Sequence, residues 1–286
     1  MSPPGAANPT KIQAPAVVAA ALKASFDRFA AELRSVHQKG EKAEAHDLRV
    51  GIRRLLAALE LALALDEELV PPRVLRDLKR VLDALSPLRD VEIQRHALDA
   101  RDLPEGTRRE LGKRLARREH KVRRALKKRA DEFPLRRAEQ AVAAACGVLE
   151  ANDGDRTPSA RLAVVGAIAR RYWTFDRRRR AAANAGMKEL HRVRIAFKKY
   201  RYAVELGAPL LKPLPEQARE AMKLFQDQLG ALQDSVVVLE LLDRGRATHD
   251  LVEELANQQR DLAATLRETL AAQSSARVPE FSQPLR

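Results

Sequence analysis

Two segments of the chain carry a histidine followed by basic residues at the spacing of one helical face. In the second segment, His191, Arg194 and Lys198 are three and four residues apart, and Arg201 and Tyr202 continue the series. Because an α-helix completes a turn every 3.6 residues, these five side chains would form one polar stripe. Like charges on adjacent turns repel each other. The stripe therefore predicts an anionic partner that offsets the repulsion.

The spacing of the stripe also indicates which kind of anion would bind. Cations that recur once per turn stand about 5.4 Å apart along a helix axis, which favours an extended polyanion over a single phosphate group. Arginine offers a planar fork for two oxygen contacts, whereas lysine and histidine supply charge and single donors. We therefore expect a groove for a phosphate polymer.

The pattern occurs twice, which indicates an internal repeat. Residues 46–54 align with 191–199 at an offset of 145, and 85–90 align with 229–234 at an offset of 144. Two blocks at nearly one offset are hard to attribute to composition, so we expect two related helical halves about a pseudo-two-fold axis. The polyanion-binding residues predicted from the two copies are His46, Arg49, Arg53, Arg54, Arg89, His191, Arg194, Lys198, Lys199, Arg201 and Tyr202.

Each stripe has an apolar face beside it and an acidic residue in the companion block. Asp90 and Asp234 are expected to orient or neutralise the basic side chains rather than to contact the ligand. The apolar faces are expected to pack into the core of a bundle. Their residues are Leu48, Ile52, Leu55 and Leu59 in the first copy and Val193, Phe197, Tyr200 and Val204 in the second.

The rest of the chain also predicts helices. Ala, Leu, Arg, Glu and Lys dominate, and no stretch alternates with the period of two that a strand requires. The predicted fold class is all-α, with two pseudo-symmetric bundles of the four-helix type that arose by internal duplication. Proline and glycine clusters mark the breaks between helices. The helices are predicted near residues 16–37, 43–67, 72–86, 89–102, 105–131, 135–150, 159–183, 187–208, 215–230, 232–246 and 248–274.

The domain organisation follows from these breaks. A loop-like run of Asn, Asp, Gly and Pro at 151–158 is the predicted linker between the halves. The first helical half then covers 16–150 and the second covers 159–274. Residues 1–15 are expected to be a disordered tail, and 275–286 a second tail.

Positive charge is concentrated in three segments. The chain carries +14 overall, from 53 Lys and Arg against 39 Asp and Glu. Residues 108–129 hold a net +10, and 170–180 and 188–201 add +5 each, so the rest of the chain is slightly acidic. As a helix, 108–129 would be about 33 Å long. A charge run of this kind is usually a solvated face, but the alternative is a track for phosphate oxygens. The residues expected to contact phosphate there are Arg109, Lys113, Arg117, Lys121, Arg124 and Lys128.

Catalytic and cofactor-binding motifs are mostly missing. The sequence has no His-Glu-x-x-His, no Cys-x-x-Cys pair, no Gly-rich phosphate loop and no G-x-S-x-G elbow. We therefore expect no cofactor, no metal and no catalysis. The single cysteine, Cys146, is expected to be a small core residue in a reducing cytosol. We also expect no secretory signal and no membrane span, because no apolar run approaches the roughly 18 residues that cross a bilayer.

Two other function classes stay open. Nucleic-acid binding could use the same basic surface, although aromatic residues make up only 4% of the chain, which is too few for a base-stacking platform. Tyr172, Trp173 and Phe175 form the one local aromatic cluster beside basic residues. A phosphohydrolase could use His46 or His191 as acid or nucleophile, but no metal-binding carboxylate cluster is evident.

The duplicated motifs resemble those of the CHAD family, the conserved histidine α-helical domains, over residues 16–270. The resemblance implies an all-helical pair of four-helix bundles whose basic surface binds inorganic polyphosphate. It further implies a cytoplasmic protein at polyphosphate granules, with other granule proteins as partners and no membrane. The chain resembles a stand-alone member, without a fused triphosphatase domain. The matching segments are His46-x-x-Arg49-Val50-x-x-Arg53-Arg54, His191-x-x-Arg194-Ile195-x-x-Lys198-Lys199-x-Arg201-Tyr202-x-x-Glu205, Leu85-x-x-Leu88-Arg89-Asp90 and Leu229-Gly230-x-Leu232-x-Asp234.

Two positions depart from the family pattern. Leu56 stands in the first copy where the second has Arg201, and Gln233 stands where an arginine is expected beside Asp234. Both departures remove a cation. We therefore expect an asymmetric site in which the second half supplies more of the contacts.

Overall fold

The computed structural model describes residues 13–39, 45–101, 103–151, 157–182, 186–243 and 249–275. Within these ranges the chain forms α-helices and one 3₁₀ turn and contains no strand, so the predicted all-α class is confirmed. The elements are α1 (Ala14–Lys39), α2 (Ala45–Leu65), α3 (Pro72–Asp99), α4 (Glu105–Asp131), α5 (Leu135–Ala151), α6 (Thr157–Ala182), α7 (Met187–Leu206), η2 (Ala208–Leu210), α8 (Glu216–Asp243) and α9 (His249–Ser275).

The helices before and after α5 match in order and length. α1 and α6 have 26 residues each, α3 and α8 have 28 each, and α4 and α9 have 27 each. In both sets the first helix packs on the second and the third packs on the fourth. α5 is additional and packs on α1. This correspondence accords with the predicted repeat, while the duplication itself stays a prediction.

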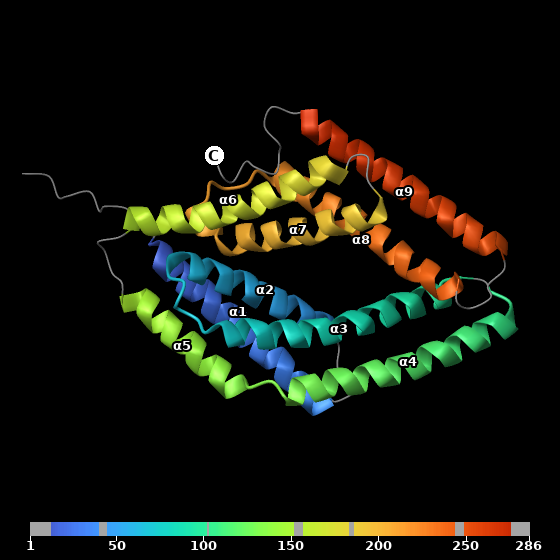
Figure 1. Cartoon of the computed structure of the whole chain (residues 1–286), viewed down its shortest axis with the longest axis horizontal. Coiled ribbons are helices and arrows are strands. Elements are labelled where there is room, and N and C mark those ends of the chain that lie inside the picture. The colour runs from blue at the N-terminus through green and yellow to red at the C-terminus, as the bar shows by residue number, and fades with distance from the viewer. Residues whose placement is uncertain are drawn as a thin grey trace, which may run out of the picture.

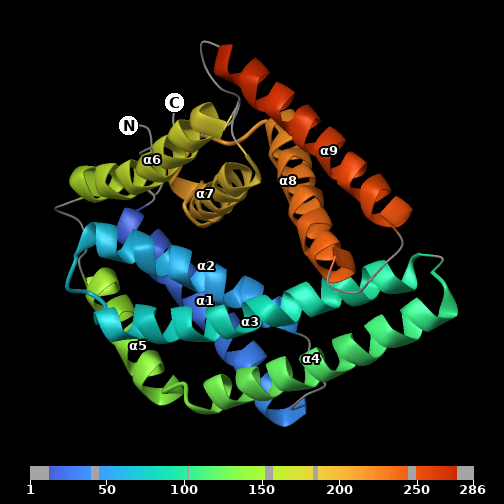
Figure 2. The same ribbon diagram turned by 45° about the vertical axis from the view of Figure 1, so that its right-hand side comes forward.

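Four helices contact one another in a closed ring at the middle of the molecule. α2 packs against α3 and α7, and α8 packs against the same two helices. Figures 1 and 2 show α4 on the outer side of α3 and α9 on the outer side of α8. The ring joins the two sets of helices and is where both predicted stripes lie.

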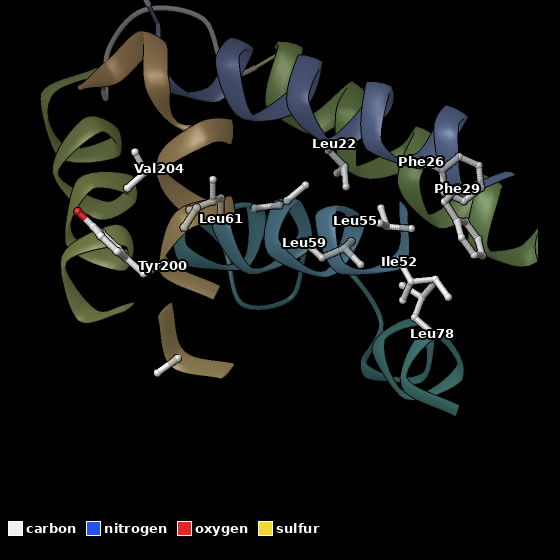
Figure 3. Packing of buried hydrophobic residues seen from close by; sticks show 14 of the residues in the cluster. Leu22, Phe26, Phe29, Ile52, Leu55, Leu59, Leu61, Leu78, Tyr200 and Val204 are labelled. Atoms are coloured by element: carbon white, nitrogen blue, oxygen red, sulfur yellow. The ribbon is translucent and has the colours of Figure 1, made fainter. Parts of the chain in front are cut away.

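The core is apolar and continuous through most of the molecule. Leu22 and Phe29 of α1 pack beside Ile52 and Leu55 of α2, as Figure 3 shows, and Tyr200 of α7 belongs to the same cluster. The predicted apolar faces of α2 and α7 are confirmed, because all eight of their residues are buried. Cys146 is also buried, with its Sγ 3.6 Å from the carbonyl oxygen of Ala19. A second, smaller cluster joins the far ends of α3, α4, α8 and α9 through Val91, Leu98, Leu111, Leu115, Val238, Leu242 and Leu255.

Two predicted helix breaks are wrong. α3 continues through Pro87, and α8 continues through Gly230. An internal proline costs a helix about 3 kcal/mol, but Leu85 and Leu88 on either side of Pro87 are fully buried and hold α3 in the core. A glycine costs only about 1 kcal/mol. The unbroken helices are what carry Arg89 and Asp234 into the ring.

The predicted tails and linker fall largely outside the described residues, since these omit 1–12, 152–156 and 276–286. The expected domain boundaries therefore stay predictions. α1 begins at Ala14, two residues before the helix expected there. None of the helices in the described ranges combines the length and apolar character that a membrane span needs.

Candidate polyanion-binding site

Five basic side chains from α2, α3 and α7 gather around one cavity of about 250 Å³. Arg53, Arg194 and Lys198 line it, while Arg49 and Arg89 lie close enough to depress the pKa of Lys198 by repulsion. We call this space the basic cavity and these five residues the cation cluster. The other polar residues that line the cavity are Glu60, Lys79, Asp83, Ser86, Lys199 and Tyr202.

The positions of the cations follow from the amphipathic pattern of α2 and α7, because each helix buries an apolar face beside its basic one. On α2, Arg49 and Arg53 are one turn apart and half-buried, next to the buried Ile52. On α7, Arg194 and Lys198 are also one turn apart, next to the buried Phe197. Packing α2 on α7 therefore brings two basic pairs face to face.

The cluster lowers the pKa of its own members. Burial, followed by repulsion from Arg194 and Arg53, lowers the pKa of Lys198 from 10.5 to about 7. Burial and the neighbouring Arg53 and Arg89 lower the pKa of Arg49 to about 10. The pKa of Arg194 is also lowered, by burial first and by Arg53 next. Holding all these groups charged in a partly desolvated space is unfavourable unless an anion is present.

Two arginine donors in the cluster are buried and have no hydrogen-bond partner in the described structure. They are Nη1 of Arg49 and Nε of Arg194. Leaving such a group unsatisfied costs about 1–3 kcal/mol, and more when the group is charged. Few buried polar groups in folded proteins lack a partner, and the described chain supplies none to these two donors.

Arg179 of α6 shows how a buried guanidinium is satisfied when its role is confined to the fold. It is fully buried. It donates from Nε and Nη2 to Oδ1 of Asp176 at 2.9 and 2.5 Å, and from Nη1 to the carbonyl oxygen of Leu270 at 3.2 Å. The cluster arginines lack such a complete set of internal acceptors.

The two predicted orienting acids lie beside the cluster. Asp234 of α8 accepts from Nη2 of Arg89 through Oδ2 at 3.5 Å, while its Oδ1 is buried without a partner. Burial raises the pKa of Asp90, against the opposing effects of Arg118 and Arg49. Both acids lie near basic side chains and neither lines the basic cavity, while their orienting role stays a prediction.

Arg118 of α4 is a residue that the sequence patterns missed. Its Nη1 donates to Oε1 of Gln94 at 3.1 Å, and Nε2 of Gln94 donates to the carbonyl oxygen of Val237 at 2.8 Å. This buried link joins α4, α3 and α8. The available signal was its position, because residue 118 lies on the same side of α4 as Leu111 and Leu115.

The two motif histidines do not line the basic cavity. His46 and His191 are both exposed. Nδ1 of His191 contacts Oε1 of Gln233, the residue that replaces the expected arginine. Within the described ranges no group of three or more His, Cys, Asp or Glu side chains is placed to hold a metal ion.

Glu205 holds two of the predicted binding residues in ion pairs. Its Oε2 accepts from Nη2 of Arg54 at 2.9 Å, and its Oε1 accepts from Nε of Arg201 at 2.8 Å. Arg201 lines a different pocket, between α7 and α8, rather than the basic cavity. Leu56 does line the basic cavity, so one wall there is apolar. Whether binding is asymmetric stays a prediction.

The structure does not bring the predicted track on α4 to the basic cavity. All six of its residues are exposed on the side of α4 away from α3. They are Arg109, Lys113, Arg117, Lys121, Arg124 and Lys128, which we call the α4 outer face.

Comparisons with known proteins identify the family. The family model described as the CHAD domain matches residues 20–243, which include the whole cation cluster. The chain belongs to the CHAD family. A crystal structure of the CHAD domain from the plant Ricinus communis has a TM-score of 0.65 and 23% identity, and the match covers 98% of this chain and 94% of that chain. The two proteins therefore share a fold. A search of curated proteins found no match.

Proposed function

We propose that this CHAD domain binds inorganic polyphosphate in the basic cavity and does not cleave it. The observation that carries the proposal is the pair of buried, unbonded donors on Arg49 and Arg194 within a cluster of five cations. Phosphate oxygens are strong acceptors, and arginine pairs with them through charge-assisted hydrogen bonds. An anion in the cavity would offset the repulsion within the cluster and would lie beside Arg194, which lines the cavity.

A polymer fits the cavity better than a single phosphate group. The basic lining of α7 runs from Arg194 to Tyr202, about 12 Å along the helix at 1.5 Å per residue. Lys79 adds charge from the α3 side. A chain of phosphates would contact several of these groups at once and release counterions at each contact, so binding should weaken steeply with salt.

Calorimetry with polyphosphate of defined length at two salt concentrations tests the proposal. We expect binding that weakens as salt rises, and an affinity at least about tenfold lower for Arg194→Met, because a hydrogen bond to a charged group contributes about 1.5–3 kcal/mol. Arg137→Met, at an exposed position on α5, is the matched control and should bind like the wild type. Binding that ignores salt, or equal affinities for the two variants, would contradict the proposal.

Nucleic acid is the competing ligand. Of the aromatic cluster that could stack on bases, Tyr172 and Phe175 are buried in the core and only Trp173 is exposed. Two of its three rings are therefore occupied by packing. We expect polyphosphate to stay bound when duplex DNA or RNA is added at equal phosphate concentration. Displacement would favour nucleic acid instead.

The absence of catalysis and the cellular site are parts of the same proposal. Incubation with long-chain polyphosphate and Mg²⁺ or Mn²⁺ should release no phosphate. Release of phosphate that depends on His46 or His191 would favour a hydrolase over a binding protein.

We place the protein in the cytoplasm at polyphosphate granules, together with other granule proteins. A fluorescent fusion should form foci that disappear in cells without the polymer, and a diffuse signal in both cell types would contradict this placement.

A further inference from the structure

The two sides of α4 differ in chemistry. Leu111, Leu115 and Leu126 are buried on the side that faces α3. At 3.6 residues per turn, the outer-face cations lie between roughly 110° and 175° around the helix from the mean direction of these leucines. The outer face therefore points away from the core.

The cations of this face have few acidic neighbours over most of its length. Near the end of α4, Lys128 lies 3.9 Å from Glu132, and the adjacent Lys127 and Arg129 pair with Asp131 and Glu132. Between residues 109 and 124, which the structure describes in full, Glu110 is the one acid on the outer side. No ion pair is seen in the described structure for the other five cations, which are Arg109, Lys113, Arg117, Lys121 and Arg124.

These five cations form a ladder suited to an extended anion. From Arg109 to Arg124 the ladder is about 22 Å long at 1.5 Å per residue, with a cation every three or four residues. Each is exposed, so binding would depend on counterion release rather than on buried contacts. A linear phosphate chain can follow such a ladder, whereas a compact anion would contact only one or two of its members.

The ladder and the basic cavity face different directions. The cavity lies between α2, α3 and α7, and α3 separates it from α4, as both ribbon views show (Figures 1 and 2). A short stretch of polymer held in the cavity would not reach the ladder at the same time. One molecule therefore presents two separate cationic surfaces on one helical body.

We infer that the α4 outer face is a second polyphosphate-binding surface, which lets one molecule bridge two segments of the polymer. The inference rests on the proposed function of the basic cavity. It adds a crosslinking role, because two separate sites on one body would each hold a different segment of the polymer. The positive charge of this surface and the linear spacing of its cations favour polyphosphate as its ligand.

Energy transfer between two populations of polyphosphate, one labelled with a donor dye and the other with an acceptor, tests the bridging. The wild-type protein should produce energy transfer that disappears at high salt. The variant with Arg109, Lys113, Arg117, Lys121 and Arg124 changed to Gln should lose most of the transfer. The affinity of its basic cavity for a short polyphosphate chain, measured by calorimetry, should stay within about fivefold of the wild type, since the cavity itself loses only long-range attraction.

A control variant separates the ladder from net charge. It carries five exposed cations changed to Gln on α1, α5, α6 and α8, and it should keep the energy transfer of the wild type. Equal transfer from the ladder variant and the wild type, or equal loss from both variants, would overturn the inference. Should the ladder variant not fold by circular dichroism, Arg117→Gln with Lys121→Gln should halve the transfer. The control positions are Lys23, Arg136, Arg137, Arg177 and Lys223.

Two further outcomes distinguish this inference from the function on which it rests. If the wild type bound no short polyphosphate at all, the proposed function would fail and the bridging with it. Short chains could instead bind normally while duplex DNA abolished the energy transfer at equal phosphate concentration. Polyphosphate binding in the basic cavity would then be supported, and the α4 outer face would be a nucleic-acid-binding surface.

Discussion

The basic cavity and the α4 outer face gather similar numbers of cations in opposite ways. In the cavity, Arg53, Arg194 and Lys198 come from two helices, converge, and are partly or fully buried. On the α4 outer face, the cations come from one helix, diverge into solvent and are exposed. Residues 108–129 carry twice the net charge of 188–201, yet the lowered pKa values cluster around the latter. Convergence and desolvation, rather than the count of charges, distinguish a binding cavity from a basic surface.

The largest expected difference between the two regions is in affinity. Changing Arg53, Arg194 and Lys198 to Gln should weaken short-chain polyphosphate binding at least about a hundredfold, because each charged contact contributes about 1.5–3 kcal/mol. The same change of charge at three α4 positions should cost less than about fivefold, since exposed charges are screened. Calorimetry on both variants measures the difference, and equal losses would erase the distinction. The α4 positions are Arg109, Lys113 and Arg117.

The next largest effect is on the pH dependence of binding. Lys198 has a pKa of about 7 in the free protein, and a bound anion favours its charged form, which raises that pKa. The complex then holds more protons than the free protein above pH 7, so affinity should fall by up to about tenfold per pH unit as pH rises from about 7. Lys198→Arg keeps the charge and should flatten the curve. A curve with the same slope in wild type and Lys198→Arg would show that Lys198 is not the group involved.

A smaller effect is expected on stability without ligand. The folded pKa of Lys198 lies below the unfolded value of 10.5, so the unfolded state binds more protons between pH 7 and 10.5. The free energy of unfolding should therefore rise with pH across that window. Below pH 7 the partly buried Lys198 is charged, and its full destabilising effect is present. Lys198→Met should raise the free energy of unfolding at pH 6 by about 1 kcal/mol, with a smaller gain at pH 10.

Lys121→Met on the α4 outer face is the matched control for this measurement. Its side chain is exposed, and surface substitutions usually change stability by less than about 0.5 kcal/mol. Urea unfolding of both variants at the two pH values makes the comparison. Destabilisation of Lys198→Met at pH 6 would mean that the lysine packs more favourably than its burial and neighbours indicate.

The smallest effect concerns cations that are held in ion pairs beside the cavity. Glu205→Gln removes the partner of Arg54 and Arg201. Both pairs are partly exposed, so the free energy of unfolding should fall by about 1 kcal/mol or less. Polyphosphate affinity should change by less than about threefold, because neither arginine lines the basic cavity. A tenfold gain in affinity would show that freeing these arginines extends the site.

Much of the local structure was predictable from the chain. The bounds of α4 match the predicted 105–131, and the apolar faces of α2 and α7 are buried as expected. These features depend on the periodicity of apolar residues within one helix, and this periodicity is visible in the sequence. The breaks predicted at Pro87 and near Gly230 were wrong, because burial of the flanking leucines outweighs the local preference of these residues.

The site was only partly predictable, because pairing between distant residues is not a local property. Arg54 belongs to the motif, but it meets Glu205 from 151 residues away. Arg118 was overlooked, because its role depends on Gln94 of a neighbouring helix. Four members of the cation cluster lie on the predicted stripes, namely Arg49, Arg53, Arg194 and Lys198, but periodicity gave no indication of which cations are neutralised by acids.

Residue type and a period of 3.6 were enough to predict that the chain is helical, which faces of its helices are apolar, and where its positive charge lies. Helix packing settled that Arg49 and Arg194 leave buried donors unbonded, while the most basic helix exposes its outer-face cations to solvent. Burial and neighbouring charge set the cost of each cation, and both depend on how α2, α3, α7 and α8 pack together.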